Sequence, residues 1–78
     1  MYKLESNFKI IATVRGSITD ARAKAISLIG NKNMVVYVYR NGMLVGLVRD
    51  WYGTYQWSNG NGKSYFVGRD GKLNGRTR

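Results

Sequence analysis

The chain has 78 residues, with 13 Lys and Arg against 4 Asp and Glu for a formal net charge of +9, and it contains no His, Cys or Pro. Without His and Cys the commonest metal ligands and the commonest general base are missing, so we expect no metal, no cofactor, no disulfide and no enzyme. This length is typical of one small domain, and we take residues 1–78 as a single basic domain in which residues 72–78 fray.

The carboxylates offer no catalytic pair. They are Glu5, Asp20, Asp50 and Asp70, and they are spread over different segments of the chain. General acid and base catalysis by two carboxylates needs them side by side, which this spacing does not favour. The run GNGKS at 60–64 echoes the end of a phosphate-binding loop, but it lies between two predicted strands, so we interpret it as a hairpin.

Alternating apolar side chains predict the first strand at residues 7–15. Phe8, Ile10, Ala12 and Val14 occupy every second position of this segment. That period is typical of a strand with one buried face. We therefore predict a half-buried strand before any helix.

The next segment, 18–29, changes to helical spacing. The apolar residues that fall on one side of it are Ile18, Ala21, Ala25, Leu28 and Ile29. Ser17 and Asp20 have the spacing of a capping box, and Gly30 suits the left-handed residue that ends a helix. Arg22 lies on the flank of the apolar side, and we expect its charged end to reach the rim.

Asn41-Gly42 predicts a type I′ hairpin turn within residues 34–49. A two-residue turn there pairs Val38 with Val45 and Val36 with Leu47. In that register one side of the hairpin holds Met34, Val36, Val38, Met43, Val45 and Leu47. The other side holds Val35, Tyr37, Tyr39, Leu44, Gly46 and Val48. We expect the first side to face the helix, and the second, with Tyr37 covering Gly46, to face away from it.

The last third of the chain continues as a meander. Residues 53–57 and 63–68 are interpreted as strands around a loop rich in Asn and Gly, and Asp70-Gly71 marks a turn before a short edge strand at 72–78. The predicted fold class is α+β in the order β-α-β-β-β, an antiparallel meander sheet with one helix on one face. A sheet curled into a half-barrel is the alternative.

Aromatic side chains are concentrated in the second half of the chain. Between positions 37 and 66 they are Tyr37, Tyr39, Trp51, Tyr52, Tyr55, Trp57, Tyr65 and Phe66. Rings on a sheet can stack on unpaired bases while flanking cations contact phosphates, and packing inside the sheet is the alternative for each ring. We predict a nucleic-acid-binding surface made of Tyr37, Tyr39, Arg40, Arg49, Tyr55, Trp57, Lys63, Arg69, Lys72, Arg76 and Arg78.

The charge favours a polyanionic partner. Residues 1–39 carry six basic and two acidic groups, and residues 40–78 carry seven and two, so both halves are positive. Nucleic acid, either DNA or RNA, is the favoured partner. The alternatives are an acidic protein, to which the chain docks as an interaction module or inhibitor, and a homodimer packed sheet to sheet.

The sequence predicts no membrane span and a cytoplasmic location. The longest apolar run, 34–39, is far shorter than the roughly 20 residues that cross a bilayer. The first residues also lack the apolar segment of a secretory signal.

Overall fold

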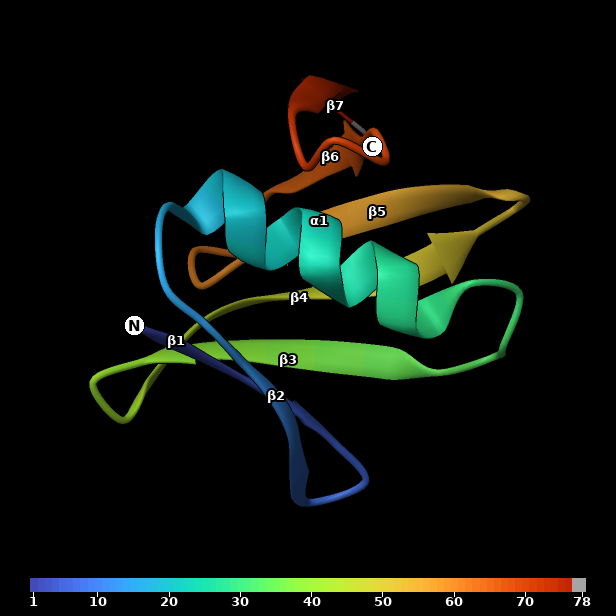
Figure 1. Ribbon diagram of the computed structural model, residues 1–78. Coiled ribbons are helices and arrows are strands. Elements are labelled where there is room, and N and C mark those ends of the chain that lie inside the picture. Colours follow the sequence, from blue (N-terminus) through green and yellow to red (C-terminus); the bar gives the residue numbers. More distant parts are fainter. Residues whose placement is uncertain (77–78) are drawn as a thin grey trace.

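The computed structural model describes residues 1–76, and for Arg76 it describes the backbone alone. Its elements in chain order are β1 (Tyr2–Ser6), β2 (Lys9–Val14), α1 (Ile18–Ile29), β3 (Val35–Arg40), β4 (Met43–Trp51), β5 (Thr54–Asn59), β6 (Ser64–Val67) and β7 (Leu73–Arg76). The strands form one antiparallel sheet in the order β2-β1-β3-β4-β5-β6-β7, and α1 lies across one face of it (Figure 1).

This architecture confirms the predicted α+β class and the antiparallel meander with one helix, but the predicted element order is only partly right. Residues 7–15 are not one strand, because β1 and β2 form a hairpin around Asn7 and Phe8. Both turn residues have a positive φ, 53° and 64°, which is the backbone of a two-residue hairpin turn. A strand therefore precedes the predicted first one. Among residues 1–76 the strands β2 and β7 are the edges of the sheet, so it stays open.

The helix prediction is confirmed at both ends. Asp20 N–H donates to Ser17 Oγ at 3.1 Å, and Ser17 N–H donates to Asp20 Oδ2 at 3.1 Å, so the capping box is complete. Gly30 follows the last turn as expected and its N–H donates to the Ile26 carbonyl, but its φ of 53° and ψ of −120° differ from the left-handed helical backbone that was predicted there. No helix among residues 1–76 is long and apolar enough to cross a membrane.

The β3–β4 hairpin turns at Asn41-Gly42 as predicted, with Arg40 opposite Met43. Tyr39 then pairs with Leu44, and directly after this pair a bulge in β4 shifts the register by one residue. Val38 pairs with Gly46, and Val36 pairs with Val48. The predicted pairs of Val38 with Val45 and of Val36 with Leu47 are therefore wrong.

The bulge also changes which β4 side chains face α1. Val48 is fully buried in the core, whereas the prediction placed it on the other side. Leu47 pairs instead with Tyr37 and shares the opposite side with it. The extra residue of a bulge reverses the alternation on its own strand alone, which explains why β3 keeps the predicted orientation.

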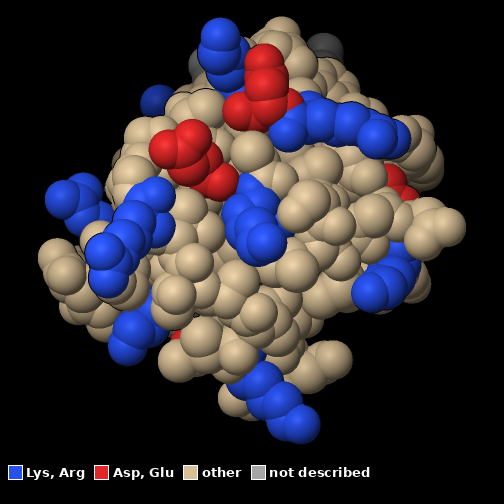
Figure 2. All heavy atoms as spheres, in the orientation of Figure 1, with Lys and Arg blue, Asp and Glu red and all other residues tan. Residues whose placement is uncertain are grey.

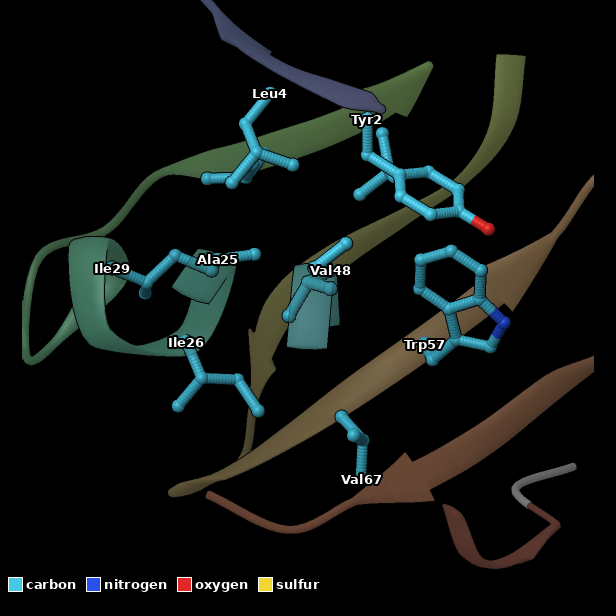
Figure 3. Close-up of a cluster of buried hydrophobic side chains, with 11 residues drawn as sticks. Tyr2, Leu4, Ala25, Ile26, Ile29, Val48, Trp57 and Val67 are labelled. Carbon is cyan, nitrogen blue, oxygen red and sulfur yellow. The ribbon is translucent and has the colours of Figure 1, made fainter. Parts of the chain in front are cut away.

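The core lies between α1 and the sheet. Side chains of α1, among them Ala25, Ile26 and Ile29, meet residues from β1, β3, β4, β5 and β6, and Figure 3 shows the rings of Tyr2 and Trp57 beside this cluster. Trp57 is only 3% exposed. Burying a side chain of this size contributes roughly 4 to 6 kcal/mol of transfer free energy.

Trp57, and not Tyr37, covers Gly46. A Cβ atom on Gly46 would lie 2.5 Å from the Trp57 ring and 2.5 Å from the Ser58 carbonyl oxygen. The space that a side chain at this position would need is filled by the indole. The predicted contact between Tyr37 and Gly46 is therefore wrong, because the two residues lie on opposite faces.

Arg22 ties α1 to the β6–β7 connection. It is 7% exposed, so it does not reach the rim as expected. Its Nε donates to the Gly71 carbonyl at 2.7 Å, and its guanidinium carbon lies 5.2 Å from the centroid of the Trp57 ring. Burial lowers the pKa of Arg22 and the nearby Tyr2 raises it in part, but an arginine remains cationic in such a site.

Candidate functional site

The sheet surface opposite α1 is the main surface that no other element covers among residues 1–76. We call it the outer face. Its side chains alternate with those of the core and include Lys3, Glu5, Ile10, Tyr37, Tyr39, Leu44, Leu47, Arg49, Trp51 and Phe66, while Gln56 on the same side is only 2% exposed. Tyr37 is 38% exposed and Phe66 is 37% exposed. Large rings are therefore presented to solvent on this face.

Two adjoining hollows lie on the outer face. One has a volume of about 290 Å³ and is lined by Glu5, Asn7, Phe8, Tyr37, Tyr39 and Leu44. The other has a volume of about 410 Å³ and is lined by Met1, Lys3, Glu5, Ile10, Tyr39, Asn41 and Gly42. Because both contain Glu5 and Tyr39, they are two parts of one concave surface over β1 and β3.

Arg49 supplies a cation on the same face. Its Nε donates to Gln56 Oε1 at 2.7 Å, and its guanidinium carbon lies 4.6 Å from the centroid of the Trp51 ring. These two contacts hold the guanidinium at a defined place. Its remaining N–H groups suit an anionic oxygen such as that of a phosphate.

Three predicted site residues lie on the helix side instead. Trp57 packs in the core, so its ring faces are not available for stacking in this structure. Tyr55 shares a strand face with Trp57, and its hydroxyl donates to the Gly30 carbonyl at 2.7 Å. Arg69 is exposed and lines a groove with Tyr55 between α1 and the β4–β5 turn, about 650 Å³ in volume.

The other predicted cations are spread around the molecule. Arg40 is exposed, with its guanidinium carbon 5.8 Å from the centroid of the Tyr2 ring. Lys63 is exposed in the β5–β6 connection, at the same end of the sheet as Arg40, because Gly60 N–H donates to the Val45 carbonyl there. Lys72 is exposed in the β6–β7 connection.

The C-terminal arginines are described only in part. Arg76 lies on β7, where its backbone pairs with Tyr65, and its side chain is not described. Arg78 lies outside the described residues. Of the eleven predicted residues, the structure therefore brings Tyr37, Tyr39 and Arg49 together on the outer face.

The sequence reasoning missed the contribution of β1 and its turn. Lys3 and Glu5 lie on the outer face next to Tyr39 and Tyr37, and Phe8 lines the smaller hollow. The available signal was the alternation in YKLES at 2–6, where polar Lys3 and Glu5 fall between apolar or small residues. That period predicts a strand with one polar face.

Charge on the helix side is mixed and not gathered into one patch. Figure 2 shows basic side chains spread around this side with acidic ones between them. Two of the four carboxylates already have structural partners, because Asp20 caps α1 and Asp70 accepts from Lys72 N–H at 3.0 Å. Residues 1–76 contain no group of three or more His, Cys, Asp and Glu that could hold a metal ion.

No family model, no curated protein and no solved structure matches this chain.

Proposed function

We propose that this chain binds single-stranded nucleic acid, DNA or RNA, on the outer face. The observation that carries the proposal is the pair Tyr37 and Tyr39, which line a concave, uncovered sheet surface in a chain of net charge +9. Aromatic rings on an open sheet stack on bases whatever their sequence, and only unpaired bases offer their faces. Lys3 and Arg49 lie beside the rings on the same face and contact phosphates.

The net charge also bears on the rival partners. Two copies of a chain with a charge of +9 repel each other, which opposes a sheet-to-sheet homodimer at low salt. A polyanion has the opposite effect, because binding releases counterions from the nucleic acid. The charge therefore favours nucleic acid over self-association on this face.

A protein-interaction module is the second candidate. Strand β2 is an edge of the sheet, and its Ile10 and Ile11 side chains are 54% and 37% exposed. An exposed apolar edge strand can pair with a strand of another protein. An acidic partner would suit the charge of this chain, and such binding would depend on β2 and not on Tyr37 or Tyr39.

The first prediction tests the two tyrosines. Changing Tyr37 or Tyr39 to Ala should weaken binding of a fluorescent single-stranded oligonucleotide of about 20 nucleotides by about 1 to 3 kcal/mol for each ring that stacks. Fluorescence anisotropy measures the affinity, and thermal unfolding of the same samples shows that each variant is folded. Duplex of the same sequence should bind more weakly than the single strand.

Tyr55→Phe is the matched control. It removes a hydroxyl that donates to the end of α1 on the opposite side of the sheet, so it should reduce stability slightly and leave oligonucleotide binding unchanged. The proposal is wrong if the wild-type chain does not bind the oligonucleotide. It is also wrong if both tyrosine variants bind as tightly as the wild type while a change of Ile11, which lies outside both hollows, abolishes capture of an acidic protein.

A further inference from the structure

Three hairpin turns of this chain share one backbone but differ in their side chains. The turn residues are Asn7-Phe8 between β1 and β2, Asn41-Gly42 between β3 and β4, and Tyr52-Gly53 between β4 and β5. All six residues have a positive φ between 51° and 83°. Asn-Gly is the pair best suited to this turn. The other two turns carry an aromatic residue where Gly or Asn would fit with less strain.

The two aromatic turn residues gain little from packing within the chain. Phe8 is 103% exposed and Tyr52 is 91% exposed. Tyr52 makes one ring contact, edge-on to Trp51 with 4.9 Å between centroids. A bulky residue in the left-handed region is strained, and exposed apolar rings gain no transfer free energy. The fold itself therefore does not explain either ring.

Both rings lie at the same end of the sheet. Glu5 near the end of β1 pairs with Tyr37, and Val35 at the start of β3 pairs with Arg49 near the end of β4. The β1–β2 and β4–β5 turns consequently point the same way, and both appear at the right of Figure 1, in blue and in yellow. The strand order separates them by three strand spacings, about 14 Å in a flat sheet.

Each ring continues the aromatic surface of the outer face. Phe8 lines the hollow that contains Tyr37 and Tyr39. Tyr52 contacts Trp51, which in turn carries the Arg49 guanidinium on its ring. We propose that Phe8 and Tyr52 are two further base-stacking residues at one end of the outer face, held in strained turns so that their rings stand free for unpaired bases. This inference rests on the function proposed above.

The surroundings of Phe8 favour nucleic-acid bases over an anionic lipid surface. The Glu5 carboxylate lines the same hollow, and pressing a carboxylate against anionic headgroups is unfavourable. A carboxylate beside a stacked base, by contrast, can accept hydrogen bonds from its amino group. Glu5 thus fits a partner that presents bases to the hollow.

The strain makes the inference testable, because relieving it should separate stability from binding. Phe8→Gly and Tyr52→Asn each turn the pair into Asn-Gly, so neither should lower Tm and each should raise it by up to about 4 to 8 °C. At the same time each should weaken binding of a labelled single strand of about 20 nucleotides by roughly 5- to 100-fold. Phe8→Trp, which keeps a ring at the turn, should restore binding.

Met43→Ala is the matched control for exposed apolar surface, because Met43 is 72% exposed beside the Asn41-Gly42 turn at the other end of the sheet. It should leave affinity unchanged. If the wild type binds the oligonucleotide and the two turn variants bind equally well, the inference is overturned while the proposed function stands. If the variants lose binding only with a lowered Tm, the rings are structural and the inference is overturned.

A titration with lipid vesicles tests whether the two rings bind an anionic lipid surface instead of nucleic acid. The same proteins are titrated with vesicles of phosphatidylserine and phosphatidylcholine. If the wild type binds vesicles but not the oligonucleotide, and the turn variants lose vesicle binding, the rings insert into lipid and both the inference and the proposed function are overturned. Oligonucleotide binding that depends on both rings, with vesicle binding that does not, supports the inference.

Discussion

Gly46 and Trp57 show how one residue pair decides what faces the core and what faces solvent. The indole of Trp57 occupies the space above Gly46 and packs among the buried side chains. Trp57 shares a strand face with Tyr55, as the spacing of two residues predicted, but that face is the helix side. The alternation of aromatic and polar side chains in β5 predicts this shared face. It does not predict whether the helix or solvent lies against that face. Trp57, one of the four rings predicted to stack on bases, is therefore a core residue.

The residue-scale prediction concerns Gly46. Gly46→Ala should lower the free energy of unfolding by about 1 to 3 kcal/mol, because the added methyl group displaces the Trp57 ring or the backbone of β5. Urea unfolding measures the change. Gly60→Ala is the control, since its nearest heavy atoms would be 3.8 Å from the new Cβ, and it should change stability by no more than about 0.5 kcal/mol. Equal effects of both changes would contradict the packing described here.

At the scale of elements, the sequence predicted the helix ends and the hairpin turn that are determined by residues close together in the chain. Ser17, Asp20 and Gly30 mark the ends of α1, and Asn41-Gly42 marks the turn of the β3–β4 hairpin. The first hairpin was missed because Asn7-Phe8 lacks the glycine that usually reports a type I′ turn, so the predicted strand at 7–15 includes both turn residues and β1 has no predicted counterpart. The bulge in β4 was missed because an extra residue leaves no local pattern when both faces of a strand are apolar.

The element-scale prediction concerns the start of α1. Ser17→Ala removes the acceptor of the Asp20 N–H and should lower the free energy of unfolding by about 0.5 to 2 kcal/mol. Ser27→Ala, at an exposed position inside the same helix, should be close to neutral because Ala is the better helix former. Denaturant unfolding of the two variants side by side checks this. A loss for Ser27→Ala as large as that for Ser17→Ala would argue against the capping role.

At the scale of the whole molecule, composition predicts a polyanionic partner but not the place where that partner would bind. The net charge of +9 is a property of the sequence and needs no fold. The place depends on the layer to which each ring belongs, and the sheet divides the predicted residues between two faces. Tyr37, Tyr39 and Arg49 share the outer face with Lys3 and Phe8, while Tyr55, Trp57 and Arg69 lie on the side of α1. That division follows from tertiary packing and the β4 bulge.

The most direct test of the account is a nuclear magnetic resonance titration of the isotope-labelled chain with an unlabelled single strand of about 20 nucleotides. Backbone amide shifts report which face meets the ligand. The account predicts that shifts concentrate at Lys3, Phe8, Tyr37, Tyr39 and Arg49 and spare the exposed side of α1. Shifts centred on Ser27, Tyr55 and Arg69, which line the helix-side groove, or no shifts at all, would contradict it.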